Sequence, residues 1–142
     1  MKISTKGRYG LRVMIHLVRQ KDNEPTQMGS IAKHEDISRK YLHSLLSMLM
    51  SAGLVRSIRG AKGGYILARP ANKILISEVI EALEGVFDPT DCVGDMSVCK
   101  KAQDCAARDV WLEVKIAVEN VFARRTLDEF AQKKRPPKMY HI

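Results

Sequence analysis

The chain has 142 residues, of which 45% are hydrophobic, enough for one domain or for a small domain with an appendage. It has no apolar run of about 18 residues and begins with a charged segment, which argues against a transmembrane helix and a signal peptide and predicts a cytoplasmic protein. Its three cysteines cannot all pair with one another, and cytoplasmic thiols stay reduced, so a disulfide framework explains them poorly.

The formal net charge of +8 is unevenly distributed. Residues 1–75 contain 14 Lys or Arg and 4 Asp or Glu, whereas residues 76–142 contain 10 and 12, so the two parts carry +10 and −2. A basic half favours a polyanion such as nucleic acid as partner, although a solubilising surface would carry the same sign.

Two helices are predicted first in the basic half. The first covers roughly residues 5–20, where one apolar stripe recurs at helical spacing: Leu11, Met14, Ile15 and Val18. The segment KDNEP interrupts this pattern, and a shorter helix follows in QMGSIAKHED. Its inward residues are Met28, Ile31 and Ala32.

The third helix, ISRKYLHSLLSMLMSAGLV, is expected to have Ser38 as its N-cap and to stop at Gly53. Its apolar face is Leu42, Leu45, Leu46 and Leu49. Its opposite face carries small polar and basic side chains, as a helix-turn-helix recognition helix does, although an ordinary surface helix would also show this pattern. The candidate DNA contacts are Ser38, Arg39, Lys40, Tyr41, His43 and Ser44.

A basic hairpin is predicted directly after this helix. Two short β-branched runs, LVRSI and GYILA, surround the glycine-rich tip RGAKGG. We interpret the hairpin as a wing whose Arg59 and Lys62 reach a minor groove or the flanking phosphates. The tip glycines allow a close approach to DNA, or they only make a tight turn.

The I-S-x-x-Y-L opening of the third helix and the R-G-x-x-G-G-Y wing resemble the Rrf-two family of bacterial winged-helix regulators, with IscR-, NsrR-, RirA- and CymR-like members. The resemblance covers nearly the whole chain and is nearest to the IscR-like regulators. It implies a mainly α fold with a small β-hairpin wing and a double-stranded DNA operator as partner. Residues 1–84 would form the winged helix-turn-helix domain and its linker helix.

The second half is predicted to begin with the helix ISEVIEALEG, with Ser77 as N-cap and Gly85 as stop, followed by a loop without periodicity over residues 85–106. A strong helix comes next, over roughly residues 107–125. A short last helix, capped by Thr126 and Glu129, completes the segment 107–131, and residues 132–142 form a flexible basic tail.

The strong helix carries a wide apolar stripe that includes Trp111, Val114, Val118, Val121 and Phe122. One small winged helix cannot cover all of this stripe, so its simplest partner is the same helix of a second copy. Burial inside a single chain is the alternative. The family resemblance implies the homodimer, with this helix as its main contact.

All three cysteines, Cys92, Cys99 and Cys105, lie in the loop with the spacing C-x6-C-x5-C. This is neither the C-x2-C pair of a zinc finger nor a redox C-x-x-C. Loose spacing in an irregular loop favours an iron–sulfur cluster, either 2Fe–2S or 4Fe–4S. A single zinc ion with a fourth ligand and three redox-reactive free thiols remain as alternatives.

The fourth ligand departs from the family pattern. IscR-like members place a His three residues after the last cysteine, where this chain has Arg108. NsrR-like members use an acid near the partner's N-terminus, where this chain has Arg8. Asp91, Asp104, Asp109 and a small exogenous ligand remain open candidates.

The function predicted from these features is that of a cluster-sensing transcriptional repressor. Its target genes would serve iron–sulfur biogenesis, iron supply, or the redox and nitric oxide response. An enzyme is not expected, because no P-loop or dinucleotide pattern is present and the histidines, His16, His34, His43 and His141, do not assemble with a nucleophile. We expect no membrane partner and no small-molecule substrate. An iron–sulfur or zinc carrier and a cluster-free thiol regulator are the alternatives.

Overall fold

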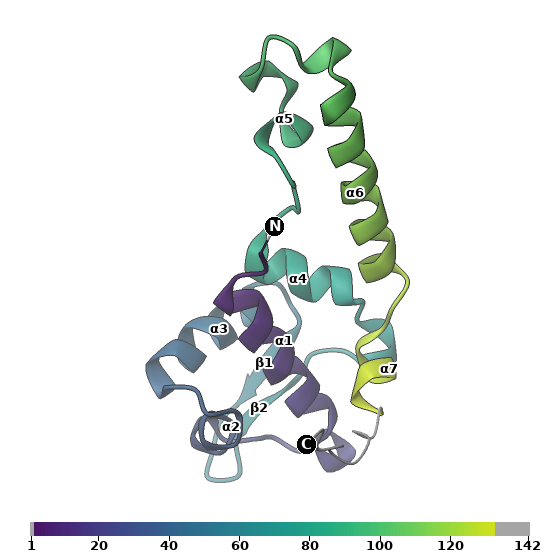
Figure 1. Ribbon diagram of the computed structural model, residues 1–142. Helices are drawn as coiled ribbons and strands as arrows, with labels where there is room; N and C mark the ends of the chain where they lie inside the picture. The colour runs from purple at the N-terminus through teal and green to yellow at the C-terminus, as the bar shows by residue number, and fades with distance from the viewer. Residues whose placement is uncertain (1, 133–142) are drawn as a thin grey trace, which may run out of the picture.

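The computed structural model describes residues 2–132, which form a globular body and a projecting arm (Figure 1). The body comprises residues 2–84 together with the last helix, and the arm comprises residues 85–123. No described helix is long and apolar enough to cross a membrane. The helices of the body are α1 (Thr5–Val18), α2 (Met28–Glu35), α3 (Arg39–Ser51), α4 (Ile76–Glu84) and α7 (Leu127–Ala131), with short 3-10 turns at Lys21–Asn23 and Ala71–Lys73.

Helix α1 is held against α4 at its N-terminal end. The Ser4 hydroxyl accepts hydrogen bonds from the backbone N–H groups of Lys6 and Gly7, and the Glu84 carboxylate accepts from the N–H groups of Ser4 (3.0 Å) and Gly7 (2.9 Å). Side chains at Gly7 and Gly10 would collide with Glu84 and Leu83, so these glycines let the two helices approach closely. The capping thus joins the first helix to the last helix before the arm.

The apolar stripe predicted for α1 is displaced in the structure. Of the four predicted residues only Met14 is buried, while Leu11, Ile15 and Val18 are half-buried. Val13 and Leu17 take their place in the core. The reason is that α4 and α7 both pack on α1, so the buried face is set by two neighbours.

Helices α2 and α3 form the helix-turn-helix. Asp36, in the left-handed conformation, turns the chain between them, and the Ser38 hydroxyl caps α3 by accepting from the Tyr41 N–H at 3.2 Å. The four predicted leucines of α3 are fully buried and form the centre of the core: Leu42, Leu45, Leu46 and Leu49. Gly53 has a φ of 71° and follows the end of the helix, as its sequence position predicted.

The wing is an antiparallel hairpin of β1 (Val55–Ile58) and β2 (Gly64–Leu67), with Val55 opposite Leu67 and Ile58 opposite Gly64. Thr26 bridges to Tyr65 and adds a third segment to its edge. Gly64 has a positive φ and lies against the backbone of Thr26, where a side chain would not fit. This glycine is therefore required by packing inside the protein.

The N-cap of α4 lies two residues earlier than predicted. Ser77 lies inside the helix, and the cap is Leu75, whose N–H donates to the Glu78 carboxylate at 2.9 Å. Gly85, with a φ of 79°, ends the helix as predicted. The Glu129 carboxylate accepts from the Thr126 N–H at the start of α7, which confirms that cap.

Helix α7 belongs to the body, contrary to its predicted grouping with the long helix. Leu127 is fully buried, its N–H donates to the carbonyl of Ile74, and the N–H of Ile76 donates to the carbonyl of Arg125. The chain therefore leaves the body after α4, forms the arm, and returns to the same core. The proposed tail, residues 132–142, lies outside the described residues except for Gln132, which directly follows α7.

The arm contains α5 (Asp91–Gly94), 3-10 turns at Met96–Val98 and Ala102–Asp104, and the long helix α6 (Ala106–Ala123). The loop predicted to lack periodicity thus consists largely of single helical turns. Its first part is tied to α6 by Lys115, whose ammonium group contacts the Asp88 carboxylate at 2.7 Å. This hydrogen bond raises the pKa of Lys115.

Candidate DNA-binding and cysteine sites

The recognition helix presents a polar surface to solvent. Arg39, Lys40, His43 and Ser44 are all exposed along α3, opposite the buried leucines. The Arg39 guanidinium lies over Gly29 at the start of α2, where a larger residue would collide with it. These side chains come from the one face of the helix-turn-helix that the core leaves free.

Tyr41 lies differently from its neighbours. It is half-buried, and its ring packs edge-on against Tyr9, with the ring centroids 6.1 Å apart. Its hydroxyl is buried and has no hydrogen-bond partner among the described residues. Tyr41 therefore packs between α3 and α1, and the exposed residues on either side of it are better placed to reach DNA.

The tip of the wing projects two basic side chains. Arg59 and Lys62 are exposed in the turn between the strands, and neither forms an ion pair within residues 2–132. The turn is closed by a hydrogen bond from the Gly63 N–H to the Gly60 carbonyl at 3.0 Å, and Gly60 has a φ of 110°. Two unpaired cations on a short, well-defined turn suit phosphate or minor-groove contacts.

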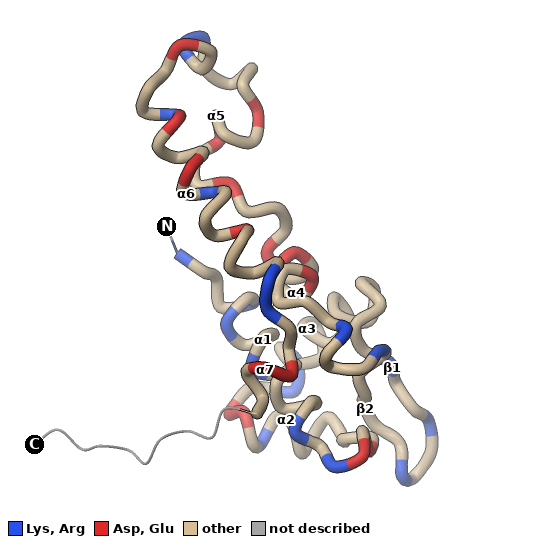
Figure 2. The backbone as a smooth tube through the Cα atoms, turned by 90° about the vertical axis from the view of Figure 1, so that its right-hand side faces the viewer, with Lys and Arg blue, Asp and Glu red and all other residues tan. Residues whose placement is uncertain are grey.

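Charge is divided between the two parts of the molecule. Residues 2–84 contain 14 Lys or Arg and 7 Asp or Glu, whereas residues 85–123 contain 4 and 7. Figure 2 shows the wing marked by basic positions and the arm by several acidic ones. The field of the molecule therefore favours DNA on the body and disfavours it on the arm.

The three cysteines lie in the loop of the arm. All three are free thiols; Cys99 is exposed, and Cys92 and Cys105 are half-exposed. Cys92 lies in α5, and Cys105 directly precedes α6. Their sulfur atoms do not lie close enough together to bind a single metal ion. Among the described residues, only one other group of side chains brings three ligand atoms that close to one another. The donor set of three accessible thiols fits an iron–sulfur cluster, whose ligands are spread around several metal atoms.

Arg108 stands three residues after Cys105, the sequence position considered above for a fourth ligand. Its guanidinium Nε donates to the carbonyl of Cys92 at 2.8 Å, across the loop. A guanidinium has no lone pair to offer a metal at ordinary pH. Arg108 therefore joins the two ends of the cysteine segment and does not itself serve as a metal ligand.

Comparison with known proteins agrees with this architecture. Residues 3–133 match the Rrf2 family, described as iron-dependent transcriptional regulators. The chain belongs to the Rrf2 family. It is 41% identical over 131 residues to the transcriptional regulator CymR of Bacillus subtilis, covering 92% of this chain and 90% of CymR.

Two solved Rrf2 structures have the same fold. That of B. subtilis CymR, described as the global cysteine regulator, has a TM-score of 0.79 with 39% identity and covers 95% of this chain and 99% of that one. That of T. potens IscR has a TM-score of 0.76 with 34% identity and covers 96% and 94%. The winged helix-turn-helix predicted from the sequence is thereby confirmed, and the relatives are regulators and not enzymes. Of these two relatives, the one more similar to this chain is the cysteine regulator.

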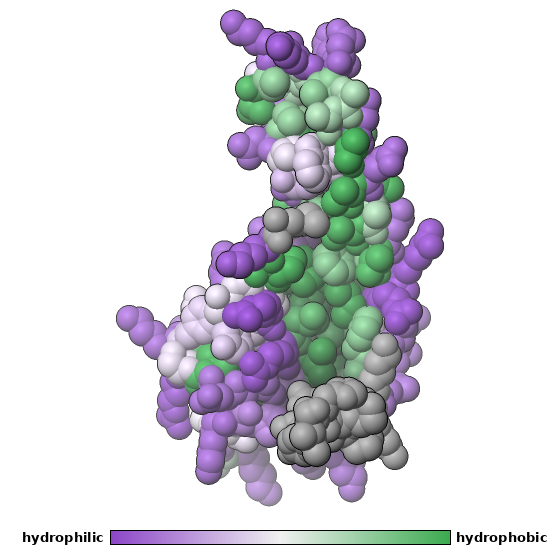
Figure 3. All heavy atoms as spheres, viewed as in Figure 1, coloured by the Kyte–Doolittle hydropathy of each residue, from purple (hydrophilic) through white to green (hydrophobic). Residues whose placement is uncertain are grey.

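The long helix of this Rrf2 protein is not covered by its own chain. None of the 18 residues of α6 is buried, and Trp111 and Val121 are 44% and 62% exposed. Figure 3 shows apolar side chains gathered along this helix and continuing onto the body. Burial of the stripe within one chain, the alternative considered above, is therefore wrong. Only Phe122, at the end nearest the body, packs against the core, while Val114 and Val118 are half-buried.

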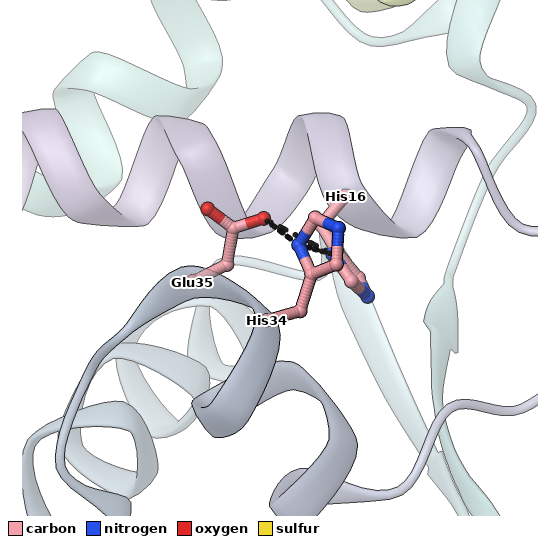
Figure 4. Close-up of side chains that lie close together, drawn as sticks. All are labelled: His16, His34 and Glu35. Atoms are coloured by element: carbon pink, nitrogen blue, oxygen red, sulfur yellow. Dashed lines mark hydrogen bonds and ion pairs between the residues drawn. The ribbon is translucent and has the colours of Figure 1, made fainter.

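One group of side chains was missed by sequence reasoning. His16 and His34, for which no shared site was predicted above, meet at Glu35 between α1 and α2 (Figure 4). Burial opposes ionisation of Glu35, but hydrogen bonds from His34, His16 and Arg12 outweigh it and lower its pKa. Because His34 follows His16 by 18 positions, no local sequence motif indicates that the two histidines share a site.

Proposed function

We propose that this Rrf2 protein is a homodimeric repressor that binds an iron–sulfur cluster through Cys92, Cys99 and Cys105. The observation that carries the proposal is that all three free thiols lie in one accessible loop at the far end of α6 from the body. A site so far from the recognition helix suits an effector that regulates DNA binding. The basic body supplies the affinity for DNA, and the arm supplies the regulation.

The residues that would hold the cluster are chemically suited to it. Thiolates are the usual protein ligands of iron–sulfur clusters, and a bound cluster would supply a group that iron shortage, oxygen or nitric oxide removes or alters. Three protein ligands leave one position for an exogenous group or a nearby carboxylate. A site with an incomplete protein ligand set is easily emptied, which is useful for a sensor.

The dimer would connect the loop to the DNA-binding surface. Helix α6 has 18 residues and is therefore about 27 Å long. If two copies pair antiparallel along α6, the cysteine loop of one chain lies beside the body end of the partner's α6. A change in the loop can then alter the spacing of the two recognition helices, which determines the fit to two half-sites.

A second function has its own support. CymR, which is 41% identical to this chain, is described as the global cysteine regulator, and a related structure is that of the oxidised form of Staphylococcus aureus CymR. Three accessible thiols could equally report oxidation directly, without a cluster. Both functions use the same body and dimer, and they differ only in what the arm binds.

The deciding experiment is anaerobic purification followed by a visible spectrum and counts of iron and sulfide per chain. The cluster proposal expects colour and bound iron that are lost in Cys92→Ala, Cys99→Ala and Cys105→Ala and retained in Ser97→Ala, a control in the same loop. A colourless wild-type protein after reconstitution, or zinc bound in place of iron, would reject the cluster. Equal operator affinity with and without the cluster would reject sensing alone.

A further inference from the structure

The His16, His34 and Glu35 group brings three potential ligand atoms to one point. The Nδ1 atoms of His16 and His34 are 3.1 Å apart, and they lie 3.1 Å and 2.9 Å from Oε1 of Glu35. His16 comes from α1, and the other two residues come from the last turn of α2 (Figure 4). Two helices thus direct their side chains at one small volume.

No arrangement of protons satisfies all three contacts. If both Nδ1 atoms carry a proton, each donates to Oε1, and the two N–H groups then face each other across 3.1 Å. If only one carries a proton, the lone pair of the other nitrogen faces the carboxylate oxygen. A cation placed among the three atoms accepts a lone pair from each and removes this conflict.

The distances and the donor types suit a transition metal. Zinc binds imidazole nitrogen and carboxylate oxygen at about 2.0–2.2 Å, which places tetrahedral ligand atoms about 3.4 Å apart. The observed separations of 2.9–3.1 Å need only a small outward movement. His34 is 68% exposed and free to make that movement.

A further residue orients the carboxylate. The Arg12 guanidinium donates to Oε2 of Glu35 at 3.0 Å and to the Glu35 carbonyl at 2.7 Å. Oε1 is therefore left to face the histidines, as second-layer hydrogen bonds commonly arrange metal ligands. The group opens onto a groove whose lining includes Arg19, Gln20 and Ser30, so an ion can enter and keep a water ligand.

We propose that His16, His34 and Glu35 form a binding site for a divalent transition metal ion of the zinc type. Two imidazoles and one carboxylate with an open position make a common ligand set for such ions. The ion would tie α1 to the end of α2, directly before the Asp36 turn that leads into α3. Occupancy would therefore stiffen the helix-turn-helix, independently of the cysteines in the arm.

The test uses the full-length Cys92→Ala/Cys99→Ala/Cys105→Ala protein, so that thiolates cannot contribute. Co²⁺ should bind to one site per chain, with the visible absorption of nitrogen and oxygen ligation. In the same background His34→Ala should weaken Co²⁺ binding at least about tenfold, whereas His43→Ala, an exposed histidine on α3, should not. Undiminished Co²⁺ binding by the His34→Ala protein, or absence of binding by its parent, would overturn the proposal.

Thermal unfolding gives a second measurement. Zn²⁺ should raise the unfolding midpoint of the cysteine-free protein and leave that of its His34→Ala form unchanged, because only a site in the folded body stabilises it. An equal shift in both proteins would place the ion elsewhere and reject the site. If the cysteine-free protein does not fold, wild-type protein with alkylated thiols and its His34→Ala form take its place.

Discussion

The body and the arm of this Rrf2 protein differ in how much of their apolar surface they bury. The body buries the leucines of α3, Met14 of α1 and Leu127 of α7 in one core. The arm buries only Val93 and Ala102, and its long helix buries nothing. The body buries its apolar faces within one chain, whereas the arm leaves an apolar helix and three free thiols accessible.

This difference separates the part of the chain that stabilises the fold from the part that leaves reactive and apolar groups accessible. Burial of apolar surface is the main favourable term in folding, so the body carries the stability of the chain. An uncovered apolar face marks a site of association, and accessible thiols mark a site for chemistry. The two parts should therefore respond independently to substitution, and the following predictions test that independence in order of decreasing effect.

The largest effect is expected at the centre of α6. Val118→Glu would place an unpaired charge in the seam between two copies and abolish the dimer, because burying an isolated carboxylate is very costly. The body should keep its unfolding transition. Sedimentation measures the change, with the exposed Asn120→Glu as control. A Val118→Glu protein that still sediments as a dimer would place the interface elsewhere.

The next effect is expected at the wing. Arg59→Ala should weaken operator binding about tenfold or more and lower the salt dependence, because a contact to a phosphate or the minor groove is lost. Lys100→Ala removes the same charge from the arm and should leave the affinity nearly unchanged. Binding measured across a salt series distinguishes the two, and equal behaviour of both variants would remove the wing from the mechanism.

A smaller effect is expected on the recognition helix. His43 is exposed on α3 and can donate to or accept from a base edge, so His43→Ala should change which operator sequence is preferred more than the total affinity. Selection of binding sites from a random DNA pool measures this, with Ser51→Ala at the other end of the helix as control. The same selected motif for wild type and His43→Ala would contradict the prediction.

The smallest effect concerns stability within the body. Burial opposes ionisation of Glu78, but the N–H of Leu75 and the Arg69 guanidinium lower its pKa. Its contribution is therefore present at neutral pH and is lost as the pH falls through the folded-state pKa. Because both partners are partly exposed, Glu78→Gln should cost less than about 1 kcal/mol at pH 7.

Denaturant unfolding at several pH values checks this prediction. The difference between wild type and Glu78→Gln should shrink under acidic conditions, while Glu81→Gln, at an exposed position of α4, should show no such trend. A difference that stays constant down to acidic pH would mean that the Glu78 carboxylate does not act through its charge.

Much of the body could be predicted from local sequence. The 3.6-residue period placed four leucines on one face of α3, and Ser38 and Gly53 marked its ends, because caps and periodicity are local properties of a helix. The hairpin followed from two β-branched runs around glycines. The cysteine loop was also predicted, because residues 85–106 lack the periodicity of the helices on either side.

Only the tertiary structure decided which neighbours share a surface. In the packed structure, the buried face of α1 includes Val13 and Leu17, and α7 packs on the body through Leu127. His16 lies against His34 and Glu35 only because α1 and α2 pack together. Periodicity tells which side chains of a helix share a face, but not which other helices meet that face or at what angle. A chain's own pattern therefore determines its elements, whereas a core shared by distant segments, or a site between two helices, exists only once those elements have packed.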